Sequence, residues 1–118
     1  MSSDTRNIFV CVSQYRKPIE EVVAHLPEHM VWLKKQDGLG RTVATGRQAS
    51  GTGGICIMAA QSRDEMLEIL ATDPFEIHGC ASYWVFELEP NPVPDRGRLM
   101  DYFFGADFAA GNDAGVQG

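Results

Sequence analysis

Apolar residues recur with two different periods along this chain, and the change of period separates strand-like from helix-like segments. The run from Ile8 to Tyr15 is rich in β-branched and aromatic residues and becomes polar at its end, which predicts a strand leaving a buried sheet. Strand-like patterns return at 41–49, 53–60 and 80–89. Ser50-Gly51-Thr52-Gly53 joins the first two of these, and its glycines can supply the positive φ of a tight turn. We therefore expect an antiparallel hairpin there.

The segment after Pro18 has the spacing of a helix. Its apolar residues recur every three or four positions, which gathers them into one stripe on a helix that runs to about Gln36. This expected buried stripe consists of Ile19, Val22, Val23, Leu26, Met30 and Leu33. Pro27 predicts a kink or a break into two pieces near Leu26, and the glycines at 38 and 40 predict the end of the helix.

A second helix is predicted to begin at Ser62. The run Ser62-Arg63-Asp64-Glu65 has the form of a capping box, in which the serine hydroxyl and the glutamate carboxylate each satisfy a free amide at a helix start. The buried stripe of this helix is expected to be Met66, Ile69 and Leu70. The helix must stop at Asp73, because Pro74 disfavours helical geometry in the residue before it.

The predicted order is β-α-β-β-α-β, which is the ferredoxin-like arrangement of an α+β fold with two helices on one face of an antiparallel sheet. Alternating strand residues make both faces of the sheet apolar, with Val10, Val12, Ile55 and Ile57 on one side and Phe9, Cys11, Cys56 and Met58 on the other. Since helices cover only one face, the second face needs another partner, and an identical sheet is the simplest. We therefore expect a homodimer.

Residues 1–94 are expected to form this domain, and residues 95–118 a C-terminal tail. Large apolar side chains gather in the first part of the tail, at Leu99, Met100, Tyr102, Phe103 and Phe104. We expect this cluster to dock on the body, on the dimer mate or across a pocket mouth, and the sequence does not choose among the three. The Gly-rich and Asp-containing end, 111–115, is expected to be disordered.

Composition excludes several classes of protein. A chain of 118 residues with 44% hydrophobic and 22% charged residues is about one domain long and can fold without a metal or a disulfide. The net charge of -6, with scattered Lys and Arg, argues against nucleic-acid binding. No apolar run is long enough to cross a bilayer, and the polar start, Met1 to Asn7, lacks the core of a signal peptide. We expect a cytoplasmic protein without nucleic-acid or membrane partners.

The three cysteines, Cys11, Cys56 and Cys80, lie one in each of three strand-like segments. They lack the close pairing of zinc ribbons and redox motifs, so we interpret them as small buried apolar residues. The histidines are not paired at the spacings of metal-ligand sets, and the short glycine runs are wrongly placed for a nucleotide loop. We expect neither a metal nor a cofactor.

Two polar residues stand beside the buried stripes. His29 lies about 70° from the centre of the first stripe, at the boundary of core and solvent, where it can transfer a proton or merely complete the helix surface. Asp73 extends the second stripe and points inward at a helix C-terminus, where the dipole disfavours negative charge. It can orient an imidazole and raise its basicity, or serve as a turn residue before Pro74. Because both helices cover one face, we predict that His29 and Asp73 lie within hydrogen-bonding range in a largely apolar pocket.

Other polar residues are weaker candidates. Arg47, at a strand end, can bind an anionic or phenolate oxygen, or form a surface salt bridge. Tyr15 and Tyr83 can donate to a substrate oxygen, or can be structural. His25 is expected on the solvated surface, and His78 is a further candidate in the connection that holds Asp73.

Several local patterns together resemble the YciI-like (YCII-related) family of dimeric α-β barrels, over roughly residues 8 to 90. They are Glu28-His29-Met30-Val31-Trp32-Leu33, Thr45-Gly46-Arg47-Gln48, Gly53-Gly54, and Asp73-Pro74-Phe75 followed by Gly79 and Tyr83. The resemblance implies a pocket between sheet and helices that holds a His and an Asp, matching His29 and Asp73. It adds Phe75 to the candidate substrate-binding residues Arg47, Tyr15 and Tyr83.

The resemblance also bears on activity. Family members include a 5-chlorohydroxyhydroquinone dehydrochlorinase, which removes chloride from an aromatic diol without a cofactor, as well as accessory proteins. We therefore expect a cofactor-independent lyase or isomerase acting on a small cyclic or aromatic oxygenated metabolite, with a His-Asp pair. The alternatives are a non-catalytic dimeric small-molecule-binding or pathway accessory protein and, less favoured, cofactor-free oxygenation.

Overall fold

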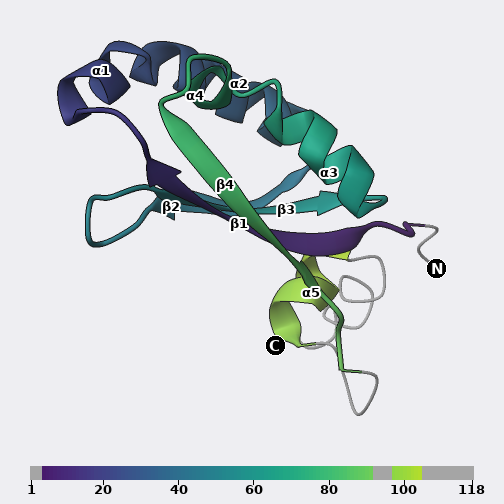
Figure 1. Cartoon of the computed structure of the whole chain (residues 1–118). Helices are drawn as coiled ribbons and strands as arrows, with labels where there is room; N and C mark the ends of the chain where they lie inside the picture. The colour runs from purple at the N-terminus through teal and green to yellow at the C-terminus, as the bar shows by residue number, and fades with distance from the viewer. Residues whose placement is uncertain (1–3, 92–96, 105–118) are drawn as a thin grey trace. The chain divides into compact units, whose positions relative to one another are not determined.

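The computed structural model describes residues 4–91 and 97–104 (Figure 1). The chain divides into two compact units. One is Arg6–Leu88, which contains the sheet and its helices, and the other draws on both ends of the chain. The predicted boundary at residue 94 falls between the two described ranges and remains a prediction.

Four strands and four helices make up the unit Arg6–Leu88. They are β1 (Asn7–Tyr15), α1 (Ile19–Ala24), α2 (Leu26–Gly38), β2 (Thr42–Arg47), β3 (Gly54–Ala60), α3 (Arg63–Leu70), α4 (Pro74–Ile77) and β4 (Ala81–Leu88). The strands form one sheet in the order β2-β3-β1-β4, and every neighbouring pair is antiparallel. This confirms the predicted α+β, ferredoxin-like fold.

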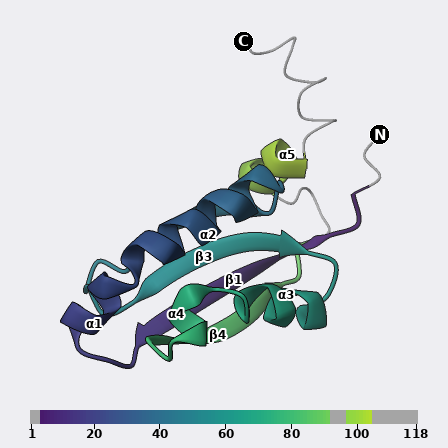
Figure 2. The same cartoon turned by 90° about the horizontal axis from the view of Figure 1, so that it is seen from above.

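All four helices of this unit lie on one face of the sheet (Figure 1). Seen from above, α1 and α2 run along one side, while α3 and α4 lie beside each other on the other side (Figure 2). The main core fills the space between sheet and helices. It consists of Phe9, Cys11, Trp32, Cys56, Met58, Ala60, Met66, Ile69, Leu70 and Val85. The alternate positions Phe9 and Cys11 of β1 thus point toward the helices, as a strand's period of two requires.

The first predicted helix is in fact two helices. His25 lies between α1 and α2, and Pro27 occupies the first turn of α2, where its missing amide hydrogen costs nothing. The predicted break near Leu26 is therefore confirmed. The predicted buried stripe is mostly wrong: Val22 is buried, whereas Ile19 and Val23 on α1 and Leu26 and Met30 on α2 are exposed. The most buried residues of α2 are instead Trp32 and Gln36.

Helix α3 begins as predicted. The Ser62 hydroxyl accepts the backbone N–H of Glu65, and the Glu65 carboxylate accepts the N–H of Gln61. The expected residues Met66, Ile69 and Leu70 are buried. The helix ends at Leu70, however, so Asp73 does not lie at its C-terminus. Asp73 is the N-cap of the short helix α4, which the sequence analysis did not predict.

The β2-β3 connection uses its glycines in two ways. Gly51 has a φ of +78°, the conformation that the turn was expected to require. Gly53 does not have positive φ; it is needed for space, because a Cβ there would lie 1.8 Å from the Ser13 carbonyl oxygen. The same carbonyl accepts a hydrogen bond from the side-chain amide of Gln48, at 2.8 Å. These contacts fasten the connection to the end of β1.

The sheet face opposite the four helices carries large apolar side chains. On β4, Trp84 and Phe86 are 58% and 59% exposed, and they pair in register with Val12 and Val10 of β1. On β3, Ile55 and Ile57 are half-buried. The predicted second apolar face of the sheet is therefore present within Arg6–Leu88.

Residues Arg98–Phe104 form helix α5. The predicted apolar cluster of the tail is thus helical; Met100 in it is buried, whereas Tyr102 is exposed. The predicted disordered end, 111–115, lies outside the described residues. Among the described residues, no helix is both long and apolar enough to cross a membrane.

Candidate active site

His29 and Asp73 contact each other directly. The Nδ1 atom of His29, on α2, lies 2.7 Å from Oδ1 of Asp73, although 44 positions separate the two residues. Because a carboxylate oxygen can only accept, Nδ1 is the nitrogen that carries the proton, and Nε2 is left as the basic nitrogen. The predicted hydrogen-bonding contact between these residues is therefore present.

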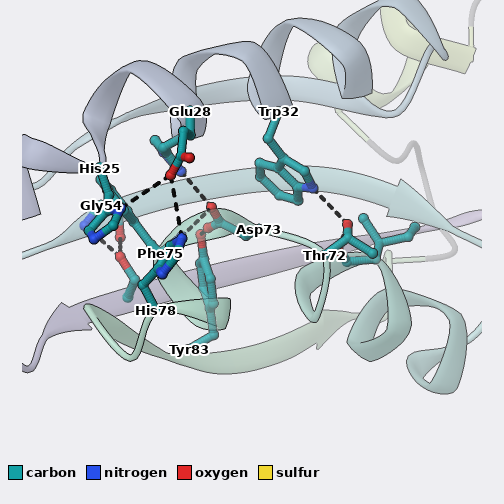
Figure 3. A network of polar contacts seen from close by, with 12 residues as sticks. His25, Glu28, Trp32, Gly54, Thr72, Asp73, Phe75, His78 and Tyr83 are labelled. Carbon is teal, nitrogen blue, oxygen red and sulfur yellow. Dashed lines mark hydrogen bonds and ion pairs between the residues drawn. The ribbon is translucent and has the colours of Figure 1, made fainter.

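The Asp73 carboxylate is fully buried and receives three hydrogen bonds. Oδ1 accepts from His29 and from the backbone N–H of Phe75, and Oδ2 accepts from the Tyr83 hydroxyl at 2.5 Å. Figure 3 shows the carboxylate between the α4 backbone and Tyr83. A buried carboxylate is stable when its lone pairs are satisfied in this way. Asp73 was predicted at a helix C-terminus and instead lies at the N-cap of α4. Its carboxylate therefore caps α4 and also contacts His29.

The His29 ring is held by aromatic packing as well as by Asp73. It stacks on Phe75 with ring centroids 4.0 Å apart and planes 5° from parallel. The Trp32 ring lies farther away, with its centroid 5.9 Å from that of His29 and the two planes 24° from parallel. Trp32 is fixed in turn, because its Nε1 donates to the Thr72 hydroxyl at 2.7 Å (Figure 3). The imidazole side chain is 12% exposed. Its orientation is therefore set before any ligand arrives.

A cavity of about 240 Å³ lies beside this pair. It is lined by Ser13, Tyr15, Leu26, His29, Met30, Leu33, Thr45, Gly46, Arg47, Gly54, Cys56, Phe75 and Tyr83. Most of the lining is apolar, with a few polar groups, which is the usual character of a small-molecule site.

All the candidate substrate-binding residues line this cavity. Arg47 lies at the end of β2 and is exposed. Tyr15, at the end of β1, packs edge-on against Phe75 with ring centroids 6.2 Å apart. Phe75 and Tyr83 reach the cavity while also contacting His29 and Asp73, so both have a structural role besides any contact with a ligand.

The sequence analysis missed several lining residues. Met30 and Leu33 were assigned to a buried stripe, yet they line the cavity. Ser13 was not singled out; it is buried, and its hydroxyl accepts the N–H of Gly54 at 2.8 Å. A signal for Ser13 was available, because it is the polar residue that follows Phe9 and Cys11 on the inward face of β1.

Burial controls the acidity of the groups deepest in the site. The pKa of the Cys56 thiol is raised to about 11, first by burial and then by the nearby Asp73 carboxylate. The pKa of Tyr83 is raised far above its ordinary value by burial, with the neighbouring Cys56 and Asp73 adding to the effect. Tyr83 therefore stays protonated, and its hydroxyl donates a hydrogen bond to the Asp73 carboxylate. The three cysteines are buried and free, which confirms their predicted character.

A second polar cluster lies where the start of α2 meets the end of α4. Oε1 of Glu28 is 3.1 Å from Nδ1 of His25 and 3.4 Å from Nε2 of His78 (Figure 3). The two imidazoles are stacked, with ring centroids 3.9 Å apart. Among the described residues, this is the group of three side chains whose ligand atoms lie close enough together to hold a metal ion. His25 was expected to be merely solvated, and spacing along the sequence gave no sign of its neighbour His78.

Comparisons with known proteins agree with the fold. A solved structure of 5-chloro-2-hydroxyhydroquinone dehydrochlorinase from Burkholderia phenoliruptrix AC1100, in complex with 2,5-dihydroxybenzoquinone, matches with a TM-score of 0.62. The two chains are 21% identical, and the match covers 75% of this chain and 99% of the other. No curated protein matches at a significant level. The family model described as the YCII-related domain matches residues 8–89, which is most of the chain, and the protein therefore belongs to the YCII-related family.

Proposed function

We propose that this protein is a cofactor-independent lyase or isomerase that acts on a small cyclic or aromatic oxygenated molecule. His29 is the general acid and base, and Asp73 orients it. The observation that supports this most strongly is the 2.7 Å hydrogen bond between the two side chains at the wall of an apolar cavity. An imidazole oriented by a buried carboxylate is a common arrangement for proton transfer near neutral pH.

The pair can begin either reaction by moving one proton. In an elimination from a halogenated aromatic diol, Nε2 of His29 first takes a hydroxyl proton and returns it to the ring carbon that bears the halogen, so that this carbon becomes tetrahedral and a carbonyl forms. A second hydroxyl proton then passes to Nε2; its O–H electrons form a second carbonyl, the ring double bond shifts to the halogen-bearing carbon, and the halide leaves with the electron pair of its bond to carbon. In a tautomerisation, the same nitrogen takes the proton from oxygen and returns it to a ring carbon. In both reactions His29 becomes an imidazolium. The Asp73 carboxylate stabilises this cation through its hydrogen bond with the Nδ1 proton.

The other lining residues have roles in this proposal. Arg47 lines the cavity, and its guanidinium would bind an anionic or phenolate oxygen. Tyr15 can donate to a second substrate oxygen, while Phe75 supports the plane of His29. The size of the cavity suits a single substituted ring, and the similar solved structure holds a dihydroxybenzoquinone.

Chloride release from chlorinated hydroxyhydroquinones, measured with a halide-sensitive assay, tests the proposal, together with product analysis of non-halogenated diols. His29→Ala should lower turnover by about tenfold or more by removing the proton carrier, and Asp73→Asn should do so by releasing its orientation. Asp64→Asn, an exposed carboxylate at the start of α3, is the matched control and should leave turnover unchanged. Full turnover in His29→Ala would contradict the proposal.

The second candidate is a small-molecule-binding or accessory protein that uses the same cavity without chemistry. It is favoured by the largely apolar lining of the cavity, which needs no proton transfer to hold a ring. Calorimetric binding of a quinone or quinol that leaves the ligand unchanged over long incubation would support it. In that case, His29→Ala would alter affinity only.

The homodimer belongs to the same proposal. Trp84 and Phe86 are exposed on a sheet face that the four helices of the unit do not cover, and a second copy of that face would bury them. The cytoplasmic location and the docking of the tail remain predictions.

A further inference from the structure

We propose that His25, Glu28 and His78 form a binding site for a divalent transition metal of the zinc class, separate from the His29-Asp73 pair. Two imidazoles and a carboxylate are a donor set that Zn²⁺ takes in proteins. The site goes beyond the proposed function, because none of its three residues lines the cavity beside His29.

The spacing of the donor atoms supports this assignment. Metal-ligand bonds of about 2.0 to 2.1 Å in a tetrahedral site place the ligand atoms about 3.3 to 3.5 Å apart. Glu28 Oε1 lies 3.1 Å from the His25 nitrogen and 3.4 Å from the His78 nitrogen, and all three atoms lie within 4.8 Å of one another. The donors are thus already gathered around one point, and a fourth position is left for water.

Binding requires one local rearrangement. The imidazoles are stacked with planes 15° from parallel, so each must turn until the lone pair of its nitrogen points at the shared ion. The torsion beside an imidazole is broad, and the side chains of His25 and His78 are 32% and 40% exposed, so this turn meets little resistance. The backbone at His78 is held independently, because the Lys17 ammonium donates to its carbonyl oxygen at 2.9 Å. The positive charge of Lys17 will weaken the affinity for a dication without preventing it.

The ion would join two segments that are far apart in sequence. His25 lies at the break between α1 and α2, Glu28 lies in the first turn of α2, and His78 ends α4. His29 directly follows Glu28, and Asp73 caps the other end of α4. A metal at this cluster would therefore bridge the two segments that carry the His29-Asp73 pair without touching either residue of the pair.

Untagged, metal-free protein titrated with Co²⁺ and Zn²⁺ tests this inference. Visible absorption should show a low-symmetry Co²⁺ site without the near-ultraviolet band of thiolate ligands, and Zn²⁺ should displace the Co²⁺. Saturating Zn²⁺ should raise the midpoint of thermal unfolding. His25→Ala and His78→Ala should each weaken binding by about tenfold or more, as should Glu28→Gln, which keeps the shape of the side chain.

His29→Ala is the matched histidine control for metal binding. It should keep Co²⁺ affinity close to that of the unaltered protein, because His29 is not one of the three donors. Loss of binding in His29→Ala, retention of binding in His78→Ala, or a thiolate band would each overturn the proposed site. Circular dichroism of each variant confirms that it is folded. None of these readouts depends on turnover, so failure of the metal site and failure of the proposed enzymatic function are distinguishable.

Discussion

The hydroxyl of Tyr83 donates a 2.5 Å hydrogen bond to Oδ2 of Asp73, the carboxylate oxygen that His29 does not use. Tyr83 and His29 therefore hold the carboxylate from its two ends. The raised pKa of Tyr83 keeps its proton in place for this contact. The sequence left Tyr83 open between substrate binding and a structural role, and the structure gives it a contact with Asp73 while it lines the cavity.

Removing the Tyr83 hydroxyl should therefore destabilise the fold and weaken the proposed chemistry. Tyr83→Phe leaves one oxygen of a buried carboxylate without its donor, which should lower the free energy of unfolding by about 1 to 3 kcal/mol. Urea denaturation measures this change. Tyr15→Phe is the matched control for stability, and an equal loss in the two variants would show that the contact with Asp73 is not the cause.

The exposed face of the sheet predicts the oligomeric state. The unaltered protein should have the mass of a dimer by light scattering coupled to size exclusion. Phe86→Glu should produce monomers, because it places a charge where two apolar faces would meet. Val31→Glu, at a side chain 70% exposed on α2, is the matched control and should remain dimeric. A monomeric unaltered protein at micromolar concentration would contradict the dimer.

Stability should decline at alkaline pH. The pKa of Cys56 is raised to about 11 and that of Cys11 to about 12, from an ordinary value of 9.0, mainly by burial. Above about pH 9 the unfolded chain loses these protons while the folded chain keeps them, so the folded state binds more protons and stability falls as pH rises. The contribution is complete below about pH 9 and is lost progressively up to the folded values.

The midpoint of thermal unfolding at pH 7 and at pH 10 measures this dependence. The difference between the two midpoints should be smaller in Cys11→Ala/Cys56→Ala than in the unaltered protein. The cavity that this double variant creates lowers the midpoint at both pH values. The difference between the two midpoints therefore reports the ionisation of the thiols. An unchanged difference would show that the two thiols are not responsible.

Gly53 should tolerate no side chain. In Gly53→Ala the new methyl group would lie 1.8 Å from the Ser13 carbonyl oxygen, so the backbone must shift and the free energy of unfolding should fall by about 1 to 3 kcal/mol or more. Gly38→Ala is the matched control, because nothing lies within 4 Å of its added methyl group. Chemical denaturation of the two variants should rank them in that order, and equal stabilities would contradict the prediction.

Sequence patterns predicted the four strands and the start of α3, but neither the end of α3 at Leu70 nor the short helix α4. Period-two alternation in β1 and the capping box at Ser62 are local signals, because each depends on the geometry of a few consecutive residues. The stripe of the first helix was predicted wrongly, because the spacing of apolar residues does not show whether a helix face meets the core, a cavity or solvent: Leu26, Met30 and Leu33 line the cavity.

The tertiary structure decided how the site is assembled. His29 and Asp73 were predicted as partners because both were expected on the covered face, but only the fold shows that Asp73 caps α4 and receives Tyr83. The cluster at His25 and His78 gave no sequence signal, because its members are brought together by the packing of α2 against α4. Contacts between residues far apart in sequence depend on the packing of whole elements, and short-range patterns in a single chain do not contain that information.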